Sequence, residues 1–479
     1  MDSASFQFLF FGLATAVVAN LNRSRVWRST VLTAASLYFL YALEKNPLAY
    51  VPLVGFLALG YVCILCHRKG WVRVPAASIV GVLLVYIWLK KYTFFPEAIL
   101  LHSVYFTIGL SYIFFRVMHL VIESGDGSEV AAQIGIFEYL LYTLNFTTFI
   151  SGPIQRYEEF AADQFAAVPL ELDAATVGLQ LERLVRGFFK VNVLAMFFDI
   201  FRQDALLNLT HPASTQQKIE AGFILMAVYP FFLYCNFSGY IDVVIALARL
   251  MRLRLPENFD RPFSATSFID FWSRWHITLS TWFKDYVYNP LMVALVRRVE
   301  SVSVQPFLAV FAFFATFFLV GLWHGRTSEF LIYGLLQGGG VSVNKLWQVI
   351  LTQALGRKQY KALAANALYR TLARGLTFCW FAFTLLWFWS DWAGIHSIYG
   401  ALPMERWIAI WTLIWLTASL LLAVWEQMRS ALLSLRIGDQ PILTTRYARV
   451  IYASALGTAA VFITLLLNSP APGIVYKTF

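Results

Sequence analysis

Charged residues are scarce in this chain. They make up 13% of its 479 residues, whereas soluble domains carry about 25%. Hydrophobic residues reach 59% and aromatic residues 17%. Apolar blocks near the length that spans a bilayer recur along the chain. This composition excludes an ordinary soluble domain and predicts a polytopic membrane protein.

Alternating apolar and polar residues, the pattern of membrane β-strands, are also missing, because the apolar runs are continuous. We therefore predict an all-α, polytopic membrane helical bundle. Two stretches, 155–180 and 252–304, are too polar to span as simple lipid-facing helices. The apolar runs predict helices at 4–20, 29–43, 48–66, 76–94, 100–121, 135–152, 183–201, 219–249, 305–323, 327–350, 374–390, 406–426 and 447–468.

Acidic residues are fewer than basic ones, 27 against 37. The excess does not indicate nucleic-acid binding, because the basic residues lie in short loops, as in cytoplasmic loops of membrane proteins. Their alternation predicts an outward N-terminus and a C-terminal tail outside the cytoplasm. Lys90 and Lys91 are exceptions, since they fall on the outer side. The first apolar run lacks a preceding basic region, so we expect no cleavable signal peptide.

Cysteine is rare too, with four residues. Cys63-Ile64-Leu65-Cys66-His67 matches the C-x-x-C-H haem attachment pattern. The run lies at the end of an apolar block and basic residues follow at once, which marks a cytoplasmic helix end, so we expect both cysteines to be dispensable. Cys235 and Cys379 lie inside apolar runs, and we interpret them as packing residues. We expect no haem.

Several catalytic signatures are absent. The chain has no nucleotide-binding G-x-x-x-x-G-K-[ST] loop and no G-x-S-x-G elbow of serine hydrolases. No group of three or four ligands with zinc spacing accompanies its histidines. We therefore expect no metal.

Two of the seven histidines stand out, because ionisable residues within apolar segments are costly and often functional. His276 lies in the segment 270–286, where tryptophans recur at helical spacing and predict one amphipathic helix over 271–286. His324 interrupts a long apolar run as Gly321-Leu322-Trp323-His324-Gly325. From the residues alone, three interpretations remain: structural histidines beside an interfacial helix, metal ligands, or proton transfer by a general base.

Five segments together resemble the membrane-bound O-acyltransferase family. The likeness is to its bacterial polysaccharide-modifying branch, most closely the membrane subunit of alginate O-acetylation, with the D-alanyl transferase of teichoic acids as a cousin. The segments are Ser151-Gly152-Pro153-Ile154-Gln155-Arg156-Tyr157, Asn236-Phe237-Ser238-Gly239-Tyr240-Ile241-Asp242, Pro256-Glu257-Asn258-Phe259, 271–288 and Gly321 to Gly325. Two departures occur: Leu336-Gln337-Gly338 replaces a frequent Tyr/His-Gly pair, and Arg326 stands where a small residue is common.

The resemblance implies one O-acyltransferase domain over 1–479, with core motifs at 100–350 and re-entrant or amphipathic helices around a central tunnel. It implies transfer of an acyl group, with acetyl expected, from a cytoplasmic thioester to hydroxyls of an extracytoplasmic polysaccharide. The family's invariant histidine falls on His324 and its second on His276. Acetyl-CoA is the expected donor, the bacterial inner membrane the location, and a periplasmic or membrane-anchored hydrolase-like acyltransferase the partner.

The remaining candidate residues are assigned more loosely. Candidate substrate or tunnel residues are Trp323, Trp275, Arg274, Asp285, Asn289 and Asn236. The tail 469–479 resembles a short F-x-Y-x-x-F tail of the branch, which implies that Tyr476 accepts the acyl group and relays it outward. A frayed tail without function is the alternative. Two other functions stay open: D-alanyl transfer from a carrier protein to teichoic acid, and a transporter or flippase without covalent chemistry.

Overall fold

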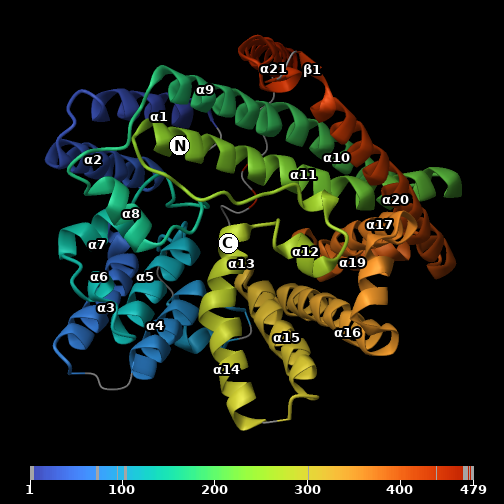
Figure 1. Cartoon of the computed structure of the whole chain (residues 1–479), viewed down its shortest axis with the longest axis horizontal. Coiled ribbons are helices and arrows are strands. Elements are labelled where there is room, and N and C mark those ends of the chain that lie inside the picture. Colours follow the sequence, from blue (N-terminus) through green and yellow to red (C-terminus); the bar gives the residue numbers. More distant parts are fainter. Residues whose placement is uncertain are drawn as a thin grey trace. The chain divides into compact units, whose positions relative to one another are not determined.

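The computed structural model describes residues 5–71, 75–93, 95–101, 105–299, 301–437, 440–467, 473 and 475. The chain forms two compact units, which are described separately (Figure 1). The first unit comprises residues 1–191, 237–257 and 473–479. The second comprises 192–236 and 258–472.

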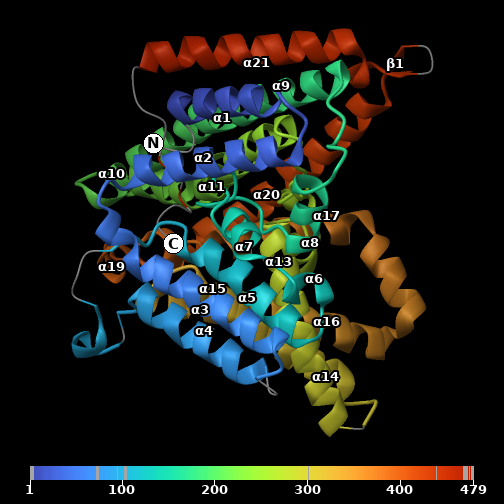
Figure 2. The ribbon, with the colours of Figure 1, turned by 90° about the vertical axis from the view of Figure 1, so that its left-hand side faces the viewer.

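Helices α1 to α4 of the first unit begin and end within about four residues of the predicted apolar runs, whereas α5 begins ten residues after the start of the predicted run 100–121, and the predicted run 183–201 is divided between α9 and α10. Serine caps three helices of this unit, since the Ser5, Ser24 and Ser128 hydroxyls accept hydrogen bonds from backbone N–H groups in the first turns. Figure 2 shows three of these helices, α3, α4 and α5, lying side by side. The helices are α1 (Phe6–Ala19), α2 (Arg25–Leu43), α3 (Val51–Arg68), α4 (Pro75–Lys90), α5 (Leu110–Gly125), α6 (Glu129–Ala132), α7 (Ile136–Thr143), α8 (Tyr157–Gln164) and α9 (Ala174–Phe189), with short 3-10 turns at Pro47–Tyr50 and Glu97–Ile99.

The second unit contains the longest helices and a buried apolar cluster that includes Leu225, Phe378, Trp407 and Ile410. The long helix α11 (Thr215–Leu250) crosses the sequence boundary between the units. The other helices of the second unit are α10 (Met196–Thr210), α12 (Phe268–Trp272), α13 (Ile277–Phe283), α14 (Asn289–Arg298), α15 (Gln305–Trp323), α16 (Ser328–Ala365), α17 (Ala367–Thr384), α18 (Leu386–Trp389), α19 (Trp392–Gly400), α20 (Met404–Ser434) and α21 (Arg446–Leu467).

Short elements connect these helices. π-helical turns cover Lys190–Ala195 and Lys284–Tyr288, here named η3 and η5, and 3-10 turns cover Pro262–Ser264 and Ile442–Thr444. The two-residue strands β1 (Arg436–Ile437) and β2 (Gln440–Pro441) pair antiparallel. Apart from this pair, the described elements are helical, so the all-α prediction is confirmed.

Six helices of the described residues are long and apolar enough to cross a membrane. They are Pro47–Arg68, Thr215–Leu250, Gln305–Trp323, Ala367–Trp389, Met404–Ser434 and Arg446–Leu466. Two further apolar helices, Phe6–Ala19 and Pro75–Lys90, are shorter. The predicted run 135–152 is only partly helical, since α7 ends at Thr143 and turns follow.

The prediction of one continuous amphipathic helix over 271–286 is wrong. The backbone leaves the helix after Trp272, and His276 adopts a left-handed conformation with φ 47° and ψ 52°. The segment is therefore two short helices, α12 and α13, with η5 after them. The apolar stripe still lies inside the protein, because Trp272, Trp275 and Trp282 are buried.

The polar stretch 155–180 contains α8 and the first turns of α9. Arginine side chains of the first unit donate hydrogen bonds to it. Asp163 accepts from the Arg254 guanidinium, whose Nε lies 3.1 Å from both carboxylate oxygens and whose Nη2 lies 2.6 Å from Oδ1, and also from the Arg254 backbone N–H. Arg28 donates to the Ala166 carbonyl. This stretch is thus hydrogen-bonded to the segment that follows α11 and to α2.

Lys90 and Lys91, which the predicted topology places on the outer side of the membrane, lie among aromatic side chains of the first unit. Lys90 is buried, donates to the Ser111 hydroxyl at 3.2 Å and lies near the rings of Tyr86 and Tyr92. Lys91 lies 4.3 Å from the ring centroid of Tyr105. Such cation–π contacts stabilise the two charges within the protein.

Candidate functional site

The backbone before His276 runs beside the Pro256-Glu257-Asn258-Phe259 motif. Asn258 O accepts from Ile277 N at 3.0 Å, and Asp260 N donates to Arg274 O at 2.9 Å. Between these bonds, Phe259 and Trp275 form an antiparallel bridge. Two motifs that are separate in the sequence thus form one short hairpin-like unit.

The Asn258 side chain holds His276 in its left-handed conformation. Its Oδ1 accepts from His276 Nδ1 at 3.3 Å, from Thr278 N at 3.0 Å and from Thr278 Oγ1 at 2.9 Å. Because Oδ1 only accepts, the imidazole proton sits on Nδ1. Both Asn258 and His276 are fully buried.

Burial lowers the pKa of His276 well below its usual value, and a positive charge on His324 would lower it further. An imidazolium loses its hydration when it is buried, so the neutral form is favoured. His276 is therefore a neutral imidazole at neutral pH.

His324 follows the last residue of α15 and is fully buried. Its Nδ1 lies 2.6 Å from the Val320 carbonyl oxygen, one turn back along the same helix. A carbonyl oxygen can only accept, so Nδ1 carries the proton and Nε2 keeps the lone pair. This is the tautomer in which Nε2 can act as a base.

A close contact between helices places His324 at the turn from α15 to α16. Figure 1 shows the two helices running side by side. Glycines permit this approach: a Cβ on Gly321 would overlap Gly334, and a Cβ on Gly338 would lie 2.7 Å from Phe314 O. The sequence predicted a deep histidine inside an apolar run. The structure places it at the end of a 19-residue helix, buried by protein.

The two histidines come together around Trp323. The Trp323 ring centroid lies 6.4 Å from that of His276 and 4.9 Å from that of His324. Tyr333 and Phe388 complete the aromatic surroundings of His324, at 5.6 and 5.7 Å. The residues far apart in the sequence therefore form one buried, aromatic-lined site.

A polar chain crosses the same region. Trp272 Nε1 donates to Gln337 Oε1 at 3.2 Å, and Gln337 Nε2 donates to Thr384 Oγ1 at 2.9 Å. All three side chains are buried. Gln337, which departs from the family pattern, thus links α12, α16 and α17.

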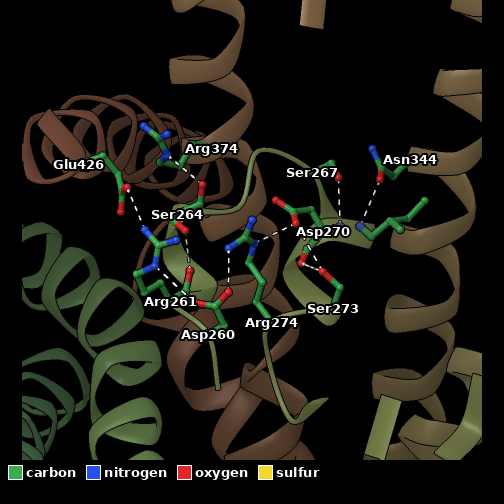
Figure 3. A network of polar contacts seen from close by, with 11 residues as sticks. Asp260, Arg261, Ser264, Ser267, Asp270, Ser273, Arg274, Asn344, Arg374 and Glu426 are labelled. Atoms are coloured by element: carbon green, nitrogen blue, oxygen red, sulfur yellow. Dashed lines mark hydrogen bonds and ion pairs between the residues drawn. The ribbon is translucent and has the colours of Figure 1, made fainter. Parts of the chain in front are cut away.

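The other predicted tunnel residues have different surroundings. Trp275 is buried, with its ring 5.0 Å from that of Phe381. Arg274 binds Asp270 at 2.8 Å and Asp260 at 3.5 Å, inside the polar network of Figure 3. That network holds the segment before His276, so Arg274 has carboxylate partners of its own.

Three more candidates complete the set. Asn236 is buried in α11, Asp285 is half-buried in η5, and Asn289 is exposed at the start of α14. Tyr476 lies outside the described residues. The roles of these residues stay predictions.

A cavity of about 330 Å³ lies in the second unit beside the segment that carries His276. Its walls come from α12, α13, η5 and α15. The apolar part of the lining consists of Ile269, Trp272, Ile277, Phe313 and Phe317. This volume lies within the usual range of small-molecule sites.

The sequence motifs include Asn258 and Gln337, but the sequence alone assigns a role to neither residue. Their partners are 18 and 65 residues away in the sequence, so local spacing contained no signal for them. Tyr333 and Phe388 were missed because aromatic residues are too common in this chain to stand out.

Comparisons with known proteins identify relatives of this chain. The sequence profile of the membrane-bound O-acyltransferase family matches residues 71–386, more than half of the chain. Curated relatives include a teichoic acid D-alanyltransferase of Bacillus subtilis, 29% identical over 277 residues, and one of Streptococcus thermophilus, 31% identical over 247 residues. A probable alginate O-acetylase of Pseudomonas syringae is 31% identical over 249 residues.

These alignments cover 58%, 50% and 52% of this chain and 67%, 57% and 45% of the three relatives. An all-helical fold whose helices are long enough to span a membrane, with a buried histidine pair, is typical of a membrane-embedded protein. The chain belongs to the membrane-bound O-acyltransferase family. The predicted family, its glycan-modifying branch and the enzyme class of O-acyltransferase are confirmed.

Proposed function

We propose that this protein transfers an acyl group, expected to be acetyl, from a cytoplasmic thioester to hydroxyls of an extracytoplasmic glycan. The observation that carries the proposal is the hydrogen bond from His324 Nδ1 to Val320 O, which leaves Nε2 as the basic nitrogen in a buried site. Family membership supports the reaction class.

The chemistry follows from this tautomer. His324 Nε2 takes the proton of the acceptor hydroxyl, whose oxygen attacks the thioester carbon. The carbon–sulfur bond then breaks, and the leaving thiolate takes the proton back from the imidazolium. The aromatic walls around His324 exclude water, which would otherwise hydrolyse the thioester. Neutral His276, held by Asn258, supplies a second polar group close to Trp323.

The orientation of α15 supports a cytoplasmic donor. Arg297 and Arg298 end α14 just before α15 begins, and basic residues beside a spanning helix favour the cytoplasmic side. His324, at the other end of α15, is then nearer the outer face. We propose the bacterial inner membrane as the location, with a hydrolase-like acyltransferase outside as the partner that completes the transfer.

D-alanyl transfer to teichoic acid is a second candidate. The relatives from Bacillus subtilis and Streptococcus thermophilus are both named as teichoic acid D-alanyltransferases. That reaction uses the same base and the same thioester chemistry. It differs in the acyl group and in a carrier protein as donor.

The test is acyl transfer by the full chain in nanodiscs, supplied with radiolabelled acetyl-CoA or with a D-alanyl carrier thioester. His324→Ala is expected to abolish transfer while leaving expression and thermal unfolding near those of the wild type. The matched control is His396→Ala, since exposed His396 bonds to the carbonyl of Trp392 at 2.6 Å in the same manner. Near-normal transfer by the His324 variant would contradict the mechanism.

A further inference from the structure

Four arginines of the first unit form a cluster, here called the arginine cluster. Arg23 lies between α1 and α2, and Arg28 lies in the first turn of α2. Arg249 lies at the end of α11, and Arg252 follows that helix. Burial lowers the pKa of Arg28, and the charge of Arg252 lowers it further. Burial also lowers the pKa of Arg252, and the charges of Arg23 and Arg249 add to that effect. Arg252 is thus close enough to the other three to be repelled by each of them.

The hydrogen bonds of the arginine cluster do not neutralise its charge. Arg28, Arg249 and Arg252 donate to carbonyl and amide oxygens, which carry no net charge. Two buried guanidinium nitrogens, Arg28 Nε and Arg249 Nη1, have no hydrogen-bond partner among the described residues. Buried donors without a partner are costly, so a further acceptor at this place is favoured.

The carboxylates near the cluster have partners of their own. Asp163 accepts from Arg254 at 2.6 Å, and Asp173 caps α9 by accepting from Thr176 N at 2.8 Å. Within the described part of the chain, no ion pair joins a carboxylate to any of the four arginines. The cluster therefore suits an external anion, and a phosphate group is a strong partner for guanidinium groups.

The surroundings of the cluster favour a phospholipid over a soluble phosphate compound. Arg23 lies in the short connection between α1 and α2, two apolar helices that lie side by side (Figure 2). The positive-inside pattern predicts that this connection lies at the cytoplasmic membrane surface. Leu21 and Val26 flank Arg23 and are 73% and 75% exposed. Basic clusters beside apolar helices at this surface attract anionic lipid headgroups, and exposed aliphatic side chains can pack against acyl chains.

We propose that the arginine cluster binds the phosphate of an anionic phospholipid in the cytoplasmic leaflet, with the acyl chains against Leu21 and Val26. A cavity of about 10 Å³ beside Arg28 has room for about one water molecule. The phosphate itself therefore lies on the outer side of the cluster, against exposed Arg23. It balances part of the charge of the cluster and so stabilises the place where the α1–α2 connection meets the end of α11. This inference is independent of the proposed acyl transfer.

The test measures lipid binding to the full chain, purified in a neutral detergent, by native mass spectrometry. Phosphatidylglycerol is compared with diacylglycerol, which has the same acyl chains but no phosphate. The wild type is expected to bind phosphatidylglycerol at least about tenfold more tightly, because several arginines contribute. Arg23→Gln is expected to weaken phosphatidylglycerol about fivefold, the contribution of one arginine near a membrane surface. Diacylglycerol binding is expected to stay unchanged in this variant.

Arg68→Gln is the matched control, because Arg68 is an exposed arginine at the end of α3, beside another predicted cytoplasmic loop. It is expected to bind both lipids as the wild type does. Arg23→Lys keeps the charge and is expected to retain most of the affinity for phosphatidylglycerol. Combining Arg23→Gln with Arg249→Gln is expected to weaken phosphatidylglycerol about 25-fold. An equal loss in the Arg68 variant would show that surface charge in general attracts the lipid, and would overturn the proposal.

Other results would also overturn it. Equal affinity of the wild type for the two lipids would mean that the phosphate is not recognised, and unchanged binding in the Arg23 and Arg249 double variant would place the lipid elsewhere. Displacement of phosphatidylglycerol by an equal concentration of inorganic phosphate would assign the cluster to a soluble phosphate compound. If the double variant loses binding to an acylated carrier protein but keeps phosphatidylglycerol, the cluster is a protein-docking surface instead.

Discussion

At the residue scale, the most consequential contact is the one between Asn258 and His276. The left-handed backbone of His276 is unusual for a residue other than glycine and costs on the order of 1 kcal/mol. Three hydrogen bonds to a single amide oxygen offset that cost. Asn258 is thus a positioning residue for the buried histidine pair.

We predict that Asn258→Asp changes the pH profile of acyl transfer. A buried carboxylate next to His276 would stabilise the imidazolium and raise the pKa of His276. If the reaction needs neutral His276, the rate would fall at a higher pH than in the wild type as the pH is lowered. Rates from pH 5 to pH 9 test this, with Asn366→Asp at an exposed helix cap as the control. An unchanged profile would argue against a role for His276 in the reaction.

Individual contacts also argue against haem attachment at Cys63 and Cys66. His67, which would have to bind a haem iron, makes hydrogen bonds from both ring nitrogens, to Ser124 at 2.9 Å and to Ser78 at 3.0 Å. We predict that replacing Cys63 and Cys66 together by serine leaves acyl transfer within about twofold of the wild type, as is usual for substitutions away from a site. A covalent haem absorbance in the purified wild-type protein would overturn the expectation that these cysteines are dispensable.

At the scale of elements, the α15–α16 hairpin sets the position of His324. Its glycines let the helices approach more closely than larger side chains would allow, and the histidine sits at the turn that this approach creates. A change in helix separation would therefore move the base relative to Trp323 and His276.

We predict that Gly321→Ala destabilises the protein by about 1–3 kcal/mol, the usual cost of overpacking, and lowers acyl transfer at least tenfold. Gly339→Ala lies on the same hairpin but meets no atom within 4 Å, so it is expected to be neutral. Thermal unfolding in detergent and acyl transfer in nanodiscs measure the two effects. Equal behaviour of the two variants would show that helix separation does not control the site.

At the scale of the whole molecule, the proposed function requires that the acyl group reach an extracytoplasmic acceptor. The C-terminal Tyr476 remains the predicted relay, although it lies outside the described residues. A phenyl ester is a better acyl donor than an alkyl ester, because phenoxide is the better leaving group (tyrosine pKa about 10).

Tyr476→Phe is therefore predicted to abolish glycan acylation while leaving thioester binding unchanged. Intact-mass measurements after incubation with acetyl-CoA would show an added acetyl group in the wild type only. Tyr447→Phe, a change at an exposed tyrosine of α21, serves as the control. Wild-type glycan acylation by the Tyr476 variant would leave direct transfer to the acceptor.

Much of the fold could be predicted from hydropathy. The expected helix at 305–323 coincides with α15, and the runs 219–249 and 447–468 match α11 and α21 within a few residues. Such helices are specified locally, because a long apolar run satisfies its backbone groups within itself. The family motifs also indicated His324 and His276 without any structure.

What only the tertiary structure decided is how these residues meet. The break at His276 depends on Asn258 from another segment, and the aromatic surroundings of His324 depend on Tyr333 of α16 and Phe388 of α18. The cavity beside α13 is lined by residues of α12, α13, η5 and α15, which come from separate segments of the sequence. Composition and periodicity determine elements, since they act over a few residues. The site arises from contacts between elements, and those depend on packing across the whole unit.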